Sequence, residues 1–188
     1  GSIRASDLMR VMGSDSSYGM SGSGAVLNAL GGIRVFDGSF SQSAGLLLGN
    51  LELRRAQVTH SGGQRTGATT LQSGSIKHSG GRVTGNLEQQ DGTYTLSGGT
   101  LAGDVLLSGG LFEQRGGVVI GNVRVTGGRY VNSGALSSIS GRVTLETGDF
   151  QIGGNTVMGN GLDNRAAMAF YQGSLTVNGA GLRNSGTM

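Results

Sequence analysis

The chain has 188 residues, enough for one domain with a sizeable core. Glycine supplies 39 residues, Pro, Cys and Trp are missing, and 13% of residues are charged, with a formal net charge of +3. Collagen is excluded, because glycine does not recur at every third position and there is no Pro. No stretch is long and apolar enough to cross a bilayer, so this segment is not expected to insert into a membrane.

Residues 1–23 do not follow the pattern of the rest. Gly1 and Ser2 are interpreted as the remnant of an expression tag. The stretch "SDLMRVMGS" could form one or two helical turns with Leu8, Met9 and Met12 on one side. Residues 1–23 are therefore expected to be a tag remnant followed by either a linker or an N-terminal cap.

Residues 24–160 contain an internal repeat with a period of about 18 residues. From Gly38 onward each row places an apolar residue third, and an insertion of two residues near 137–140 delays the seventh row. The third-place residues are Phe40, Val58, Ile76, Tyr94, Phe112, Tyr130 and Phe150. Glycine recurs in the eighth and twelfth places of the row. The fourteenth and sixteenth places are mostly apolar and the fifteenth is mostly polar. This alternation with a period of two residues is typical of a β-strand.

The repeat predicts an all-β fold, a right-handed parallel β-helix of seven to nine coils with about 18 residues per coil. The glycines are expected at corners, and the Asn residues after them in a ladder along the rod. A left-handed β-helix can have the same coil length, but its three equal sides do not match the uneven apolar spacing. A calcium β-roll is disfavoured, because its inner glycine is missing and only Asp104 supplies a carboxylate in the required column.

Residues 161–188 contain a different repeated motif. They are expected to continue the β-helix, truncated, with coils of about 20 residues. The phrase "LDNR" at 162–165 returns as "LRNS" at 182–185, with "GSLTVN" between them. This stretch resembles the haemagglutinin repeat of filamentous haemagglutinin-type exoproteins and contact-dependent inhibition stalks, although Ala166 and Ala167 stand where that family usually has Gly-Gly. "GRYVNSG", "IKHSGG" and "YTLSGG" are similar to repeats of self-associating autotransporter passengers. Both resemblances imply a secreted β-helical rod at the surface of a Gram-negative bacterium, and they differ on the secretion route.

Catalytic, cofactor-binding and metal-binding residues are not expected. His60 and His78 share a column one coil apart, which suggests an ordinary ladder more than a metal site, because no Cys or carboxylate flanks them. The acidic residues fall in different columns or on separated coils, so the paired carboxylates of a glycan-active β-helix enzyme are not predicted. Arginines also scatter over several columns, so a nucleic-acid partner is not expected. The irregular places are the candidate surface binding residues: Arg65, Ser137, Ser138, Ser140 and Arg142.

The sequence therefore predicts a non-enzymatic, rigid segment of a large secreted adhesin or exoprotein. It would mediate or project adhesion to a cell-surface receptor or glycan of a host or neighbouring bacterium. Two alternatives stay open: a fragment of a glycan-active β-helix enzyme, and a self-associating passenger that drives aggregation and biofilm.

Overall fold

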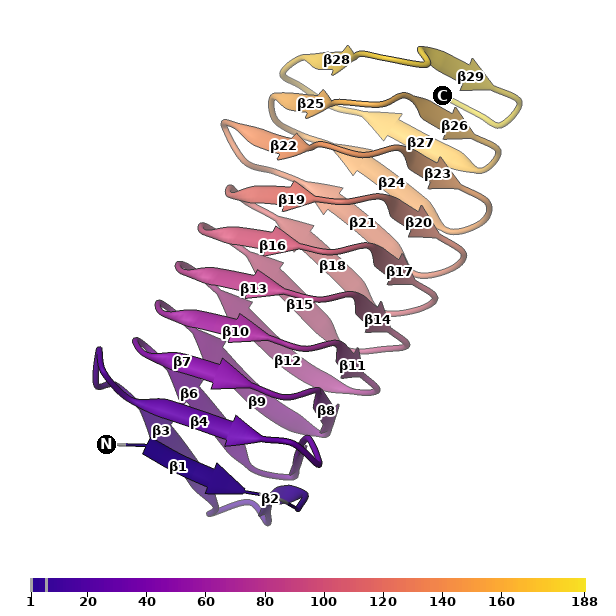
Figure 1. Ribbon diagram of the computed structural model, residues 1–188. Coiled ribbons are helices and arrows are strands. Elements are labelled where there is room, and N and C mark those ends of the chain that lie inside the picture. The colour runs from indigo at the N-terminus through magenta and orange to yellow at the C-terminus, as the bar shows by residue number, and fades with distance from the viewer. Residues whose placement is uncertain (1, 6) are drawn as a thin grey trace.

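The computed structural model describes residues 2–5 and 7–188, and in them the chain forms a β-solenoid. Three parallel sheets run the length of the rod, and each complete coil adds one strand to each sheet in turn. In Figure 1 the near strands run left to right, the far strands return behind them, and the chain climbs from N to C. This path is right-handed, as predicted.

The three sheets contain ten, ten and nine strands. The first, sheet A, consists of β1 (Ser2–Ala5), β4 (Val26–Ala29), β7 (Leu46–Leu48), β10 (Gln64–Thr66), β13 (Arg82–Thr84), β16 (Thr100–Ala102), β19 (Val118–Ile120), β22 (Ser137–Ile139), β25 (Thr156–Met158) and β28 (Leu175–Val177). Sheet B consists of β2 (Met9–Met12), β5 (Ile33–Phe36), β8 (Leu51–Arg54), β11 (Thr69–Leu71), β14 (Leu87–Gln89), β17 (Val105–Leu107), β20 (Val123–Val125), β23 (Val143–Leu145), β26 (Leu162–Asn164) and β29 (Leu182–Asn184). Sheet C consists of β3 (Ser17–Met20), β6 (Ser39–Gln42), β9 (Ala56–His60), β12 (Gly74–His78), β15 (Thr93–Leu96), β18 (Leu111–Gln114), β21 (Arg129–Asn132), β24 (Asp149–Ile152) and β27 (Ala167–Phe170).

The register between neighbouring strands confirms the predicted period. In sheet B, Leu51 pairs with Thr69, Thr69 with Leu87, and Leu87 with Val105, each a step of 18. Strands of three to five residues alternate between inward and outward side chains, so that β20 places Val123 and Val125 inside and Arg124 outside. Because the same positions repeat in every coil, each coil covers the core of the one below it.

The N-terminal residues also belong to the solenoid. The one or two helical turns considered for 6–14 are not formed: Met9–Met12 is strand β2, and Met9 pairs with Ile33. Residue 6 lies outside the described residues. Val11 points inward and Arg10 outward. Successive side chains that alternate between the interior and the solvent are typical of a strand, whereas a helix buries residues three or four apart. The open edge of β5 supplies backbone partners for β2, so residues 2–5 and 7–23 form a first coil in place of a linker.

Toward the C-terminus the coils lengthen unevenly. Leu162 pairs with Leu182, the predicted step of 20, whereas Thr156 pairs with Leu175 in sheet A, a step of 19. In sheet C, Asp149 pairs with Ala167, a step of 18. The extra residues therefore lie in the turns between the sheets, and the strands continue to stack where the repeat motif changes.

Aromatic and apolar side chains stack in columns along the axis. The third-place residues predicted to face inward are buried, and they include four consecutive rings at the centre of the rod. The ring centroids are 5.0 Å apart for Tyr94 and Phe112, 4.8 Å for Phe112 and Tyr130, and 4.7 Å for Tyr130 and Phe150. These separations match the spacing between hydrogen-bonded strands, so the rings stack face to face in register with the backbone.

One corner of every central coil requires glycine. Gly85 has φ of +134°, and a Cβ there would collide with the backbone of Gly67 in the coil below. The residue after this glycine forms the predicted ladder. Asn86 Oδ1 accepts a hydrogen bond from the N–H of Asp104 at 3.0 Å, and the same contact joins Asn50 to Ala68 at 2.9 Å. This corner leads into sheet B and borders the groove described below.

Candidate functional site

The structure does not bring the predicted surface residues together. Arg65, on β10, and Ser137, on β22, are buried, with 4% and 3% of their surface exposed, so neither is a surface binding residue. Three strands separate β10 from β22 in sheet A. Ser138 is half-buried, and only Ser140 and Arg142 are exposed. The proposed cluster is therefore wrong for Arg65 and Ser137, because an irregular residue type in a column does not change the direction of its side chain.

The two-residue insertion lies slightly earlier than expected. Val118 pairs with Ser138, a step of 20, whereas Leu111 still pairs with Arg129, a step of 18. The extra residues therefore fall in the turn between β21 and β22, where Leu136 is 79% exposed. Ser140, which follows β22, accepts a hydrogen bond on its Oγ from the N–H of Gly121 at 3.2 Å, so that it links two neighbouring coils at the corner that leads to β23. The insertion therefore lies before β22, whereas Arg142 lies after it, between β22 and β23.

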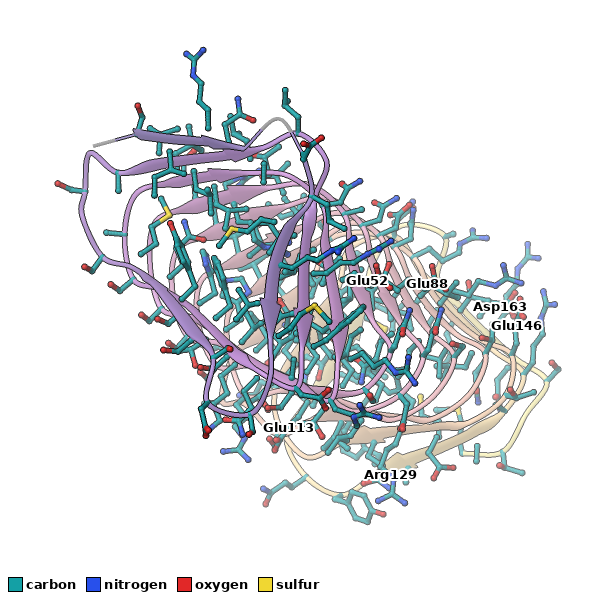
Figure 2. All side chains as sticks on the ribbon, turned by 90° about the horizontal axis from the view of Figure 1, so that it is seen from below. Glu52, Glu88, Glu113, Arg129, Glu146 and Asp163 are labelled. Atoms are coloured by element: carbon teal, nitrogen blue, oxygen red, sulfur yellow. The ribbon has the colours of Figure 1, made fainter. Side chains whose placement is uncertain are left out.

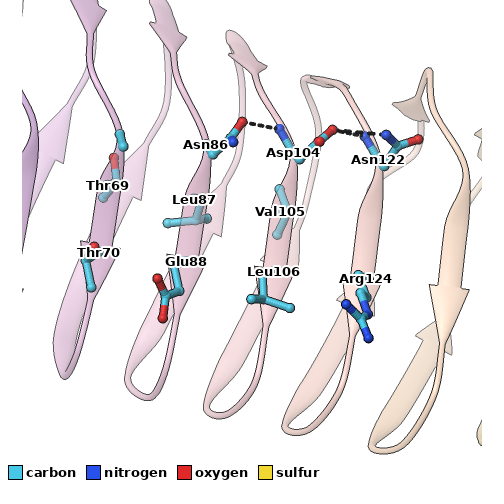
Figure 3. A pocket seen from close by; sticks show the side chains of 11 residues that line it. Thr69, Thr70, Asn86, Leu87, Glu88, Asp104, Val105, Leu106, Asn122 and Arg124 are labelled. Atoms are coloured by element: carbon cyan, nitrogen blue, oxygen red, sulfur yellow. Dashed lines mark hydrogen bonds between the residues drawn. The ribbon is translucent and has the colours of Figure 1, made fainter.

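A groove runs over the outer surface of sheet B instead. It has a volume of about 420 Å³ and crosses four coils, from β11 to β20 (Figure 3). Its lining residues are Ala68, Thr69, Thr70, Asn86, Leu87, Glu88, Asp104, Val105, Leu106, Asn122 and Arg124. They belong to three successive places in the coil: the ladder residue after the corner glycine, the inward residue that begins the strand, and the outward residue that follows.

The rim of the groove is a polar ladder. Asp104 Oδ1 accepts hydrogen bonds from the backbone N–H of Asn122 at 2.7 Å and from its Nδ2 at 3.2 Å (Figure 3). Asn122 Oδ1 in turn accepts one from the N–H of Arg142 at 2.9 Å. These bonds hold the side chains of the rim in one orientation per coil. The amide of Asn86 and the carboxylate of Asp104 are exposed, so the rim offers donors and acceptors at a regular axial spacing.

The groove continues toward the N-terminus. A second stretch of about 430 Å³ shares Ala68 and Thr70 with the first and extends along sheet B to Ile33. Glu52 lies in this stretch, accepting a hydrogen bond from Arg34 Nε at 2.6 Å and one from Gln72 Nε2 at 3.0 Å. The two stretches together form one groove parallel to the rod axis, which we call the axial groove.

Acidic and basic side chains both occur on this side of the rod. Glu52, Glu88, Glu146 and Asp163 follow the same side, whereas Glu113 lies on another face (Figure 2). Arg124 forms a two-point ion pair with Glu146, with both N–O distances 3.0 Å. Pairs of this kind across neighbouring coils balance the charge of the face. The lining of the axial groove therefore combines acidic, basic, amide and apolar side chains.

Sequence reasoning missed that two carboxylates face one groove. Glu88 and Asp104 were assigned to different columns, and both line the axial groove from neighbouring coils. The signal was available, because the ladder place and the outward strand place are two residues apart and therefore project from the same face. The apolar side chain of Leu106 lies between polar groups on this face (Figure 3). Such a surface can hydrogen-bond the hydroxyl groups of a polymer while covering its apolar patches.

The two histidines lie inside the rod. His60 and His78 are buried neighbours with ring centroids 4.9 Å apart. His60 Nδ1 is 3.2 Å from Gln42 Oε1, and His78 Nδ1 is 3.0 Å from the Tyr94 hydroxyl. Burial lowers the pKa of His60 to about 3 and that of His78 to about 4, so both rings are neutral near pH 7. Within residues 2–5 and 7–188 no three His, Cys, Asp or Glu side chains are grouped closely enough to hold a metal ion.

No family model, no curated protein and no solved structure matches the chain. Within the described part of the chain, no helix has the length and apolar character needed to cross a bilayer.

Proposed function

We propose that this chain is a rigid segment of a secreted bacterial adhesin or exoprotein, of the filamentous haemagglutinin or self-associating autotransporter type, that acts at the surface of a Gram-negative cell. We propose further that the axial groove contacts a linear glycan on a host cell or a neighbouring bacterium. The observation that carries the proposal is the continuity of the groove along consecutive coils in one register. An elongated polymer can contact such a groove with one set of donors and acceptors per coil.

The mechanical part of the proposal follows from the stacking. Every central strand is hydrogen-bonded to a strand in the coil above and another in the coil below, and stacked rings occupy one column of the interior. Bending the rod would lengthen those bonds and separate the rings on one side. A solenoid of this kind holds whatever lies at its ends at a fixed distance and direction.

Binding to an array of linear bacterial and host glycans tests the groove. The variant carries Glu88→Gln and Asp104→Asn, which preserve shape and remove both carboxylates. Loss of a hydrogen bond to a charged group weakens binding by roughly tenfold or more. The control is Glu113→Gln, whose carboxylate lies on sheet C. Equal binding by the groove variant and the control, or no bound glycan, contradicts the groove assignment.

A glycan-active enzyme is the second candidate, and one observation favours it: Glu88 and Asp104 line the same groove. Glycoside hydrolysis uses two carboxylates, one on each side of the scissile bond. The same array samples are therefore examined for shortened products by mass spectrometry. Product formation that disappears in the Glu88→Gln and Asp104→Asn variant would replace the adhesin proposal with the enzyme.

A further inference from the structure

Among the described residues, Arg65 is the one Lys, Arg, Asp or Glu that is buried. Its backbone stays in register, between Leu47 and Val83 of the neighbouring coils. Its side chain therefore extends into the interior where those coils place aliphatic groups. The Nη2 group donates a hydrogen bond to Thr69 Oγ1, and Nη1 has no hydrogen-bond partner among the described residues.

The charge of this guanidinium is not balanced from within the core. Burial lowers the pKa of Arg65 to about 10, so the side chain is still protonated at neutral pH. No Asp or Glu belongs to the buried part of residues 2–5 and 7–188. The titratable groups around Arg65 are His60, His78 and Tyr94, and burial favours the neutral form of each. A buried cation without an anionic partner is strongly unfavourable.

A small cavity lies beside the guanidinium. Its volume is about 10 Å³, and its polar lining comes from Gln42, Thr59, His60, Arg65 and Tyr94. The remaining lining is apolar, from Phe40, Leu51, Val58, Ile76 and Val83. Because this is the space open to the centre of a water-sized sphere, the cavity accommodates one water molecule or one monoatomic ion. Sulfate, phosphate and carboxylates are too large for it.

We propose that this cavity is a binding site for one small monoatomic anion, chloride, which accepts a hydrogen bond from Nη1 of Arg65. A water molecule would satisfy the same hydrogen bond but would leave the positive charge uncompensated. An anion satisfies both requirements. Because the cavity lies between the sheets, the ion is taken up as the coils fold, and the resulting ion pair anchors the coil that contains Arg65.

Crystals of the whole chain, refolded and grown in sodium chloride, provide the direct test. Diffraction at a long X-ray wavelength distinguishes chloride from water by anomalous scattering. The expected result is an anomalous peak within hydrogen-bonding distance of Arg65 Nη1. Water density without anomalous signal, or no density, overturns the proposal.

A solution experiment gives an independent test. Urea unfolding is measured from about 10 mM to about 1 M chloride, with gluconate holding the ionic strength constant. The control is Arg65→Leu, since Leu47 occupies the same place one coil below. Between the lowest and the highest chloride concentration, the equilibrium constant for unfolding of the unmodified chain should fall about tenfold or more further than that of the control. The reason is that chloride binds only the folded state of the unmodified chain. An equal response of both proteins to chloride overturns the proposal.

Discussion

The buried histidine pair makes the solenoid sensitive to acid. In the folded chain the pKa of His60 is lowered to about 3 and that of His78 to about 4, mainly by burial, and each would be about 6.5 in the unfolded chain. Below pH 6.5 the unfolded state binds protons that the folded state excludes. The contribution of the two histidines to the free energy of unfolding is therefore fully present above pH 6.5 and is lost as the pH decreases toward 4.

The size of this loss follows from the shifts. At pH 4.5 the medium is about 2 pH units below the unfolded pKa of either ring, which corresponds to about 2.7 kcal/mol for each histidine. Both folded pKa values lie at or below that pH, so the pair should account for about 5 kcal/mol between pH 7.5 and pH 4.5. The charge of Arg65 is one cause of both lowered pKa values, after burial, because it opposes protonation of the two rings.

The assay compares the unmodified chain with the double variant His60→Gln and His78→Gln. Glutamine is the matched replacement, since Gln42 and Gln114 occupy the same column in other coils. Urea unfolding, followed by circular dichroism at pH 7.5 and 4.5, should show the acid-dependent loss in the unmodified chain and little of it in the variant. If both proteins lose the same free energy of unfolding, the reasoning from histidine burial is refuted.

Three further substitutions test the corner and the core. Gly85→Ala should destabilise the chain by about 2 kcal/mol or more, because φ is +134° and a Cβ meets backbone, whereas Gly24→Ala, with open space around it, should have little effect in the same urea titration. Tyr130→Phe should cost about 1–3 kcal/mol in thermal unfolding, because it removes the 2.6 Å hydrogen bond to Gln114 Oε1 and leaves that buried oxygen unpaired. Phe112→Ala should cost about 3–5 kcal/mol by removing a ring from the stack, and an unchanged melting temperature would contradict that stack.

Much of the fold could be predicted because every coil of a solenoid repeats the same pattern of strands and turns. Phe112 and Tyr130 recur one period apart, as do Leu162 and Leu182 in the longer coils, so the spacing alone identified strand partners. The prediction failed at the N-terminus, where the step from Met9 to Ile33 is longer than either period and hides the repeat. There the open edge of the next coil, which is a tertiary feature, decides that Met9–Met12 is a strand.

The candidate site was less predictable for a different reason. Irregularity in the alignment of rows drew attention to Arg65 and Ser137, and both side chains are buried. The axial groove arises from regular positions, Glu88 and Asp104 among them, which become neighbours only when consecutive coils stack. Columns considered one at a time do not show which of them share a face.

The sequence by itself determined the all-β class, the coil length, the corner glycines and the inward columns, because each depends on residues that recur at a fixed local spacing. The tertiary structure alone decided the first coil, the position of the insertion, the burial of Arg65 beside its cavity and the continuity of the axial groove. These features depend on contacts between coils. Strand alternation sets whether a side chain points inward, and only the packed neighbours determine whether it meets a charge, a cavity or a partner there.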